Sequence, residues 1–69
     1  MNDLHYSILI QTQDGVAFSS NIVAKFKYQL DAYDFAEQQF NYYSRCYDKV
    51  TIIVYKDDET KRKYVKTRV

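Results

Sequence analysis

The chain has almost none of the residues from which small proteins build covalent or metal cross-links. It contains one cysteine, Cys46, one histidine, His5, and no tryptophan. A single cysteine forms no internal disulfide, and one cysteine with one histidine falls short of the ligand set of an ordinary protein metal site. Stability must therefore come from apolar packing, to which eight tyrosines and four phenylalanines bring large buried areas.

Glycine and long apolar runs are equally scarce. The one glycine in 69 residues excludes the glycine-rich loops that bind phosphate groups. No run approaches the ~20 apolar residues of a transmembrane helix, and the start of the chain lacks the basic segment of a signal peptide. We expect one soluble domain over residues 1–69, located in the cytoplasm, with no cofactor, no metal and no membrane partner.

Residues with catalytic potential do not combine into an active site. His5 lies at the start of a predicted strand, and Cys46 falls on the apolar side of a predicted helix near its C-terminal end, where nothing activates a thiol. Asp31 and Asp34 fit the first turns of that helix, where acids commonly act as caps. The acids at 57–59 lack the spacing of a calcium loop. We predict that the protein is not an enzyme.

Hydrophobic periodicity predicts two hairpins joined by one helix. The dipeptide Asp14-Gly15, between "HYSILIQT" and "AFSS", is a strong hairpin signal of the type I′ kind. One strand is expected near residues 5–12 and the next from about Val16, with the polar segment 19–21 marking a bulge or bend. "KVTIIVYK" and "KRKYVKTR" form the second hairpin.

The helix is predicted from about Leu30 to Tyr47. The expected fold is therefore α+β, in the order β-β-α-β-β, with a four-stranded antiparallel sheet and the helix packed on one face. On a helical wheel the apolar residues of this segment share one side: Ala32, Phe35, Ala36, Phe40, Tyr43, Cys46 and Tyr47.

The second hairpin decides which side chains face the helix. A four-residue turn over 57–60 would pair Lys56 with Lys61 and Ile52 with Val65, which directs Ile52 and Val65 toward the helix. A register shift of one residue would invert this assignment. The opposite, open face would then carry Ser7, Leu9, Gln11, Lys25, Lys27, Thr51, Ile53, Tyr55, Arg62, Tyr64, Lys66 and Arg68.

Charge is distributed unevenly along the chain. Residues 61–69 carry five cations and no acid, whereas residues 1–60 hold nine acids and five cations. The basic ending is a local feature of one strand, and it lies beside tyrosines on the predicted open face.

Two interpretations of this basic face remain open. Lysine and arginine on a terminal strand protect a sheet edge from pairing with other chains, in which case the face is simply solvated. Alternatively, tyrosine and arginine form a docking surface, either for a protein or for nucleic acid bases and phosphates. A protein is favoured because the acids at 57–59 and on the helix would repel a long polyanion. The predicted partner-binding residues are Tyr55, Arg62, Tyr64, Lys66, Arg68, Lys25, Lys27, Asp34 and Glu37.

In its size, its lack of catalytic residues and its β-β-α-β-β order, the whole chain resembles the small inhibitors encoded by phages and mobile elements, including anti-CRISPR proteins. The resemblance implies a non-enzymatic protein in the host cytoplasm that blocks a host or defence complex. Those families often mimic nucleic acid with acidic surfaces, whereas this chain has a net charge of +1 and a basic strand. Steric occupation of a protein site therefore fits better. A small nucleic-acid-binding protein is the alternative, and either would be a monomer or a homodimer.

Overall fold

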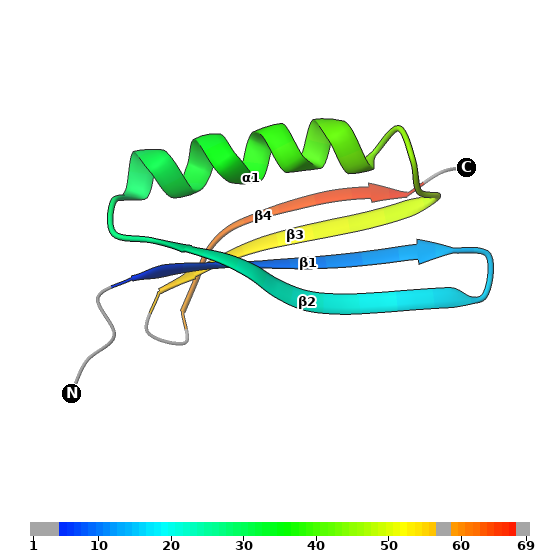
Figure 1. Cartoon of the computed structure of the whole chain (residues 1–69), viewed down its shortest axis with the longest axis horizontal. Helices are drawn as coiled ribbons and strands as arrows, with labels where there is room; N and C mark the ends of the chain where they lie inside the picture. The colour runs from blue at the N-terminus through cyan, green and yellow to red at the C-terminus, as the bar shows by residue number, and fades with distance from the viewer. Residues whose placement is uncertain (1–4, 57–58, 68–69) are drawn as a thin grey trace.

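Two hairpins and one helix make up residues 5–56 and 59–67, the part of the chain that the structure, a computed structural model, describes (Figure 1). The elements are β1 (Tyr6–Asp14), β2 (Ala17–Phe26), α1 (Gln29–Tyr43), β3 (Lys49–Lys56) and β4 (Glu59–Thr67). The four strands form one antiparallel sheet in the order β2-β1-β3-β4. The predicted fold class and element order are confirmed, and β2 and β4 are the two edges.

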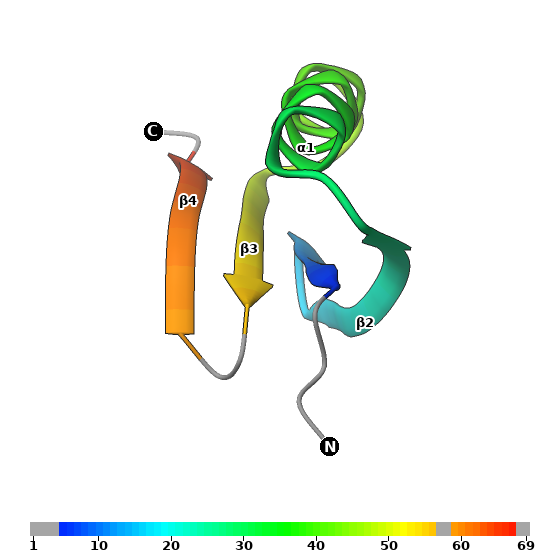
Figure 2. The ribbon, with the colours of Figure 1, turned by 90° about the vertical axis from the view of Figure 1, so that its left-hand side faces the viewer.

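The core lies between α1 and the central strands, and α1 covers one side of the sheet (Figure 2). Ile8 and Ile52 are fully buried, and so are Ala32 and Ala36, one turn apart on the helix. These two small side chains let α1 lie close to the sheet, because interiors are close-packed. Half-buried rings surround this centre: Phe26, Tyr33, Phe35, Phe40, Tyr43, Tyr47 and Tyr64.

The first hairpin turns at Gly15 and Val16, one residue later than expected. Gly15 has φ +63° and takes the first central position, the pattern of a type II′ turn rather than the type I′ turn predicted from Asp14-Gly15. β2 is continuous through the polar segment 19–21. A register shift leaves Val23 as an extra residue opposite β1, so the expected bulge lies just after that segment.

The helix is shorter than its apolar pattern indicated. α1 ends at Tyr43, and the backbone N–H groups of Arg45 and Cys46 then donate to the carbonyls three residues earlier, as in a tightened last turn. Cys46 is consequently exposed, so the prediction that it packs in the core is wrong. Tyr47 still reaches the rim of the core.

The pairing of β3 with β4 also differs from the prediction. Lys56 pairs with Glu59, so two residues rather than four separate the paired positions. Val54 pairs with Arg62, which leaves Lys61 as an extra residue in β4. The connection is two residues shorter than predicted, and the bulge compensates for one of them. The rest of β4 is therefore displaced by one residue from its predicted register.

The displacement inverts the faces of β4. Ile52 is paired with Tyr64 instead of Val65. Because side chains alternate along a strand and Ile52 is buried under α1, Tyr64 lies on the helix side together with Arg62 and Lys66. Val65 lies on the open face, where it is 55% exposed. The prediction that Arg62, Tyr64 and Lys66 line the open face is therefore wrong.

Candidate functional site

The residues of β4 that face the helix, contrary to the prediction, attach this strand to α1. The guanidinium of Arg62 lies 4.6 Å from the ring centroid of Tyr33 on α1 and 5.9 Å from that of Tyr64. The Tyr64 ring packs against Phe40 of α1, with 5.6 Å between centroids. Cation–π and ring contacts of this kind stabilise the packing of a strand against a helix, so Arg62 and Tyr64 have a structural role here.

Lys66 makes the same kind of attachment at the far end of the helix. Its ammonium donates a hydrogen bond to the carbonyl of Ser44, the C-cap residue of α1. A cation at this end complements both the unpaired carbonyls and the negative end of the helix dipole. Two cations of the basic ending, Arg62 and Lys66, accordingly contact α1 or its C-cap. A third, Lys61, forms an ion pair with Glu59, with 3.3 Å between its Nζ and the Oε2 of the carboxylate.

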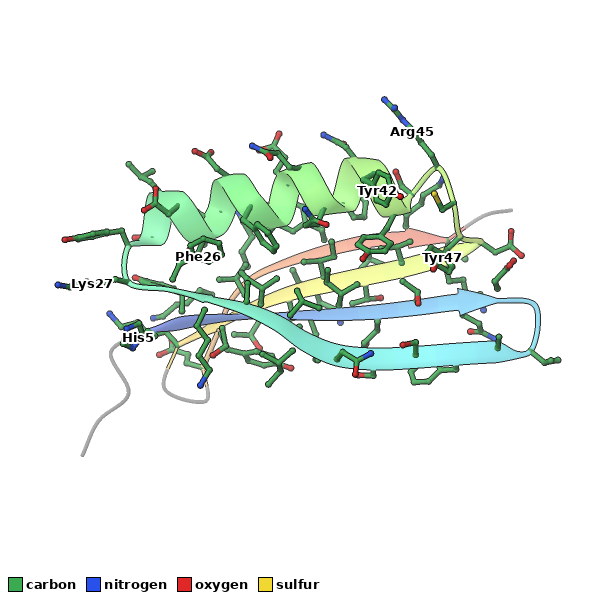
Figure 3. All side chains as sticks on the ribbon, viewed as in Figure 1. His5, Phe26, Lys27, Tyr42, Arg45 and Tyr47 are labelled. Atoms are coloured by element: carbon green, nitrogen blue, oxygen red, sulfur yellow. The ribbon has the colours of Figure 1, made fainter. Side chains whose placement is uncertain are left out.

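The remaining predicted residues lie in different places. Lys25 and Tyr55 both pair with Ser7, on the open face as predicted. Lys27 lies in the connection between β2 and α1 (Figure 3), with its ammonium 5.7 Å from the ring centroid of Tyr28. Arg68 lies outside the described residues.

The acidic flank predicted on the helix is present. Asp34 and Glu37 are exposed on α1, on the side of the helix away from Ala32 and Ala36. They lie on the other side of the molecule from the open face, so the structure separates them from Lys25 and Tyr55.

An apolar row on the open face is the feature that the sequence did not reveal. Leu9 is paired with Ile22 on one side and with Ile53 on the other. Ile22 is 60% exposed. On β4, Val65 is paired with Thr51, which lies two residues before Ile53 on the same face of β3. A contiguous exposed apolar patch commonly marks an interaction surface, whereas single exposed apolar residues do not. We call Leu9, Ile22, Ile53 and Val65 the apolar row.

Two bulges explain why the row was missed. Strict alternation back from Phe26 and Ala24 would turn Ile22 toward the helix, but the extra residue Val23 turns it to the open face. The register of β4 does the same for Val65. Neither bulge has a distinctive residue, such as glycine, that would indicate it in the sequence.

Lysines frame the apolar row. Lys63 is paired with Ile53, while Lys25 and Lys49 lie on the same face toward opposite ends of the sheet. All three are exposed. An apolar centre with a polar and charged rim is the usual anatomy of a protein–protein interface.

A pocket lies on the helix side, where the β1–β2 hairpin extends beyond α1 (Figure 1). It has a volume of about 320 Å³ and is walled by Tyr43 and Tyr47 on one side and by Thr12, Asp14 and Asn21 of the hairpin on the other. Tyr47 lies between the end of α1 and this end of the sheet (Figure 3). The pocket combines aromatic and polar walls, and Asp14 contributes a carboxylate to it.

Among residues 5–56 and 59–67, no three His, Cys, Asp or Glu side chains gather where they could hold a metal ion. The single helix of the described part is too short and too polar to cross a membrane. Comparisons with protein-family models, with curated proteins and with solved structures found no match. Function is therefore inferred from the surfaces of this chain alone.

Proposed function

We propose that the chain is a non-enzymatic protein-binding module whose contact surface is the open face of the sheet. The observation that carries the proposal is the apolar row. It runs straight across β2, β1 and β3, continues diagonally to Val65 on β4, and leaves Ile22 and Val65 more than half exposed. Tyr55 lies on the same face, and tyrosine supplies contact area at low entropic cost.

The charge of the rim indicates the chemistry of the partner. Lys25, Lys49 and Lys63 surround the row, so a complementary partner has an apolar centre and acidic residues around it. Nucleic acid fits less well, because Arg62 and Tyr64 face the helix. What remains at the centre of the open face is aliphatic, and aliphatic side chains do not stack on bases as aromatic rings do.

Within this class we propose a phage-type inhibitor that occupies a site on a host or defence complex, such as a CRISPR–Cas complex. The small size and the β-β-α-β-β architecture support this narrower proposal. An aliphatic contact surface also favours steric occupation of a protein site over imitation of a nucleic acid, which requires an acidic surface.

The experiment compares two variants that add the same charge to different faces. Val65→Glu puts an acid into the apolar row, whereas Asn41→Glu puts one on the exposed outer side of α1. Wild type, Val65→Glu and Asn41→Glu are each immobilised to capture proteins from host cells. The same three proteins are also added to reconstituted defence complexes, and inhibition of target cleavage is measured. We expect the same protein to be captured by wild type and Asn41→Glu and lost with Val65→Glu.

Capture that is unaffected by Val65→Glu would place the contact elsewhere and contradict the proposal. The nucleic-acid alternative is tested with mixed single-stranded oligonucleotides at low salt, where we expect no binding. If the oligonucleotides bind, and the association constant falls by roughly 0.7 log units per log unit of salt concentration for each phosphate contact, the result would support the nucleic-acid alternative.

A further inference from the structure

The two edges of the sheet differ in charge. β4 carries Lys61, Lys63 and Lys66 among its nine residues, which is how natural proteins protect an edge from pairing. β2 has no charged residue and no proline from Ala17 to Ala24, and its first seven residues are all exposed. A long, uncharged, exposed edge strand is open to pairing with another strand.

The hairpin register shows which backbone groups of β2 are available. A two-residue turn is closed by backbone bonds between its flanking residues, here Asp14 and Ala17. Since bonded and non-bonded pairs alternate along an antiparallel ladder, Phe18, Ser20 and Ile22 direct their N–H and C=O groups away from β1. Three residues with outward groups therefore lie in succession before the bulge at Val23.

We propose that β2 pairs antiparallel with β2 of a second copy, about a two-fold axis at Ser20. This register joins Phe18 of each copy to Ile22 of the other, so that all the paired residues are those with outward backbone groups. Both pairs lie on the open face, and cross-strand pairs of an aromatic with a β-branched residue stabilise a sheet. The result is one sheet through both copies with both helices on the same side.

Charge favours the β2 edge over the β4 edge for pairing between two copies. The equivalent full pairing of two β4 strands would set Lys63 opposite Lys63, and like charges directly opposite are destabilising. Pairing β2 with β4 would leave a free edge at each end and would form an open chain of copies rather than a closed dimer.

The dimer goes beyond the proposed function, because it uses the edge of the sheet rather than the apolar row. It would also complete the pocket. Ser19 and Asn21 line the pocket at its outer edge, and in the dimer Ser19 of one copy lies opposite Asn21 of the other. The two pockets then meet at the axis as one continuous groove.

The test is sedimentation equilibrium on the intact chain from about 10 to about 300 µM, since a contact of this size belongs to the weak class of interfaces. We expect a mass that approaches twice that of one chain. Ser20→Lys and Ser20→Glu should each weaken dimerisation by roughly fivefold, and an equimolar mixture should restore it as a heterodimer. Thr67→Lys, which adds the same charge at the exposed end of β4, should behave as wild type.

Hydrogen exchange supplies a second readout that needs no substitution. The amides of Phe18, Ser20 and Ile22 should become protected as concentration rises. A monomeric mass up to the highest concentration overturns the proposal, and so does a dimer that Ser20→Lys leaves unchanged. Val65→Glu should still dimerise, which separates a failure of the dimer from a failure of the proposed contact on the open face.

Discussion

Tyr64 shows how one side chain can stabilise and destabilise the fold at once. Its ring packs against Phe40 and under Arg62, so it links β4 to the helix. Its hydroxyl oxygen is buried and has no hydrogen-bond partner among the described residues. A buried polar group without a partner costs about 1–3 kcal/mol, whereas burial of the ring is favourable.

Removing the hydroxyl should therefore stabilise the protein. We expect Tyr64→Phe to raise the free energy of unfolding by about 1 kcal/mol, and Tyr64→Ala to lower it by about 2–4 kcal/mol because the ring contacts are lost. Urea denaturation followed by circular dichroism measures both. Tyr55→Phe, on the open face, is the matched control and should change little. A loss of stability in Tyr64→Phe would mean that the hydroxyl has a partner.

Cys46 provides a test of where the helix ends. The thiol lies in the turn after α1 and is exposed, so a thiol reagent should label it in the folded protein about as fast as in urea. Cys46→Ser should change the free energy of unfolding by less than about 0.5 kcal/mol, as is typical of surface substitutions. Strong protection of the thiol in the folded state would show that the helix continues past Tyr43 and buries it.

At the scale of the elements, periodicity predicts the strands and the helix but leaves their register open. The segment "KRKYVKTR" can direct either Tyr64 or Val65 inward, because both residues favour strands. The choice depends on the length of the connection before β4 and on the bulge at Lys61, and neither has a sequence signal. Part of the candidate site was predictable, because no bulge separates these residues from the buried neighbours that fix their side of the sheet: Leu9, Ile53, Tyr55 and Lys25.

Deleting single lysines of β4 tests this register. Lys61 is the extra residue, so its deletion should keep Arg62 opposite Val54 and cost no more than about 1 kcal/mol of stability. Deletion of Lys63 removes the same charge but must displace either Arg62 or Tyr64 to the other face. We expect that deletion to cost at least about 3 kcal/mol.

Both deletion variants are compared by urea denaturation, and contacts between the Phe40 and Tyr64 rings are followed by NMR. Retention of these contacts after deletion of Lys61 confirms the register. If the two deletions were equally harmful, Lys61 would not be the bulged residue.

For the whole molecule, the arrangement of the single helix leaves two surfaces uncovered. The chain measures 40 × 20 × 16 Å, and α1 covers one side of the sheet without reaching the end of the β1–β2 hairpin (Figure 1). The open face and the β2 edge therefore stay exposed, while Arg62 and Lys66 of β4 contact the helix and its C-cap. A chain of 69 residues buries a smaller share of its surface than a larger domain does, about 60%, and is marginally stable. Association would therefore add a noticeable fraction to its stability.

This coupling predicts that heat stability depends on concentration. If the β2 edges pair, mass action stabilises the folded state as the protein becomes more concentrated, and the Tm should rise by about 2–5 °C between about 10 and 300 µM. Ser20→Lys should unfold at nearly the same Tm throughout, whereas Thr67→Lys should follow the wild type. Differential scanning calorimetry measures all three. A wild-type Tm that does not change with concentration would mean that the folded chains do not associate, and that the exposed edge of β2 remains unpaired in solution.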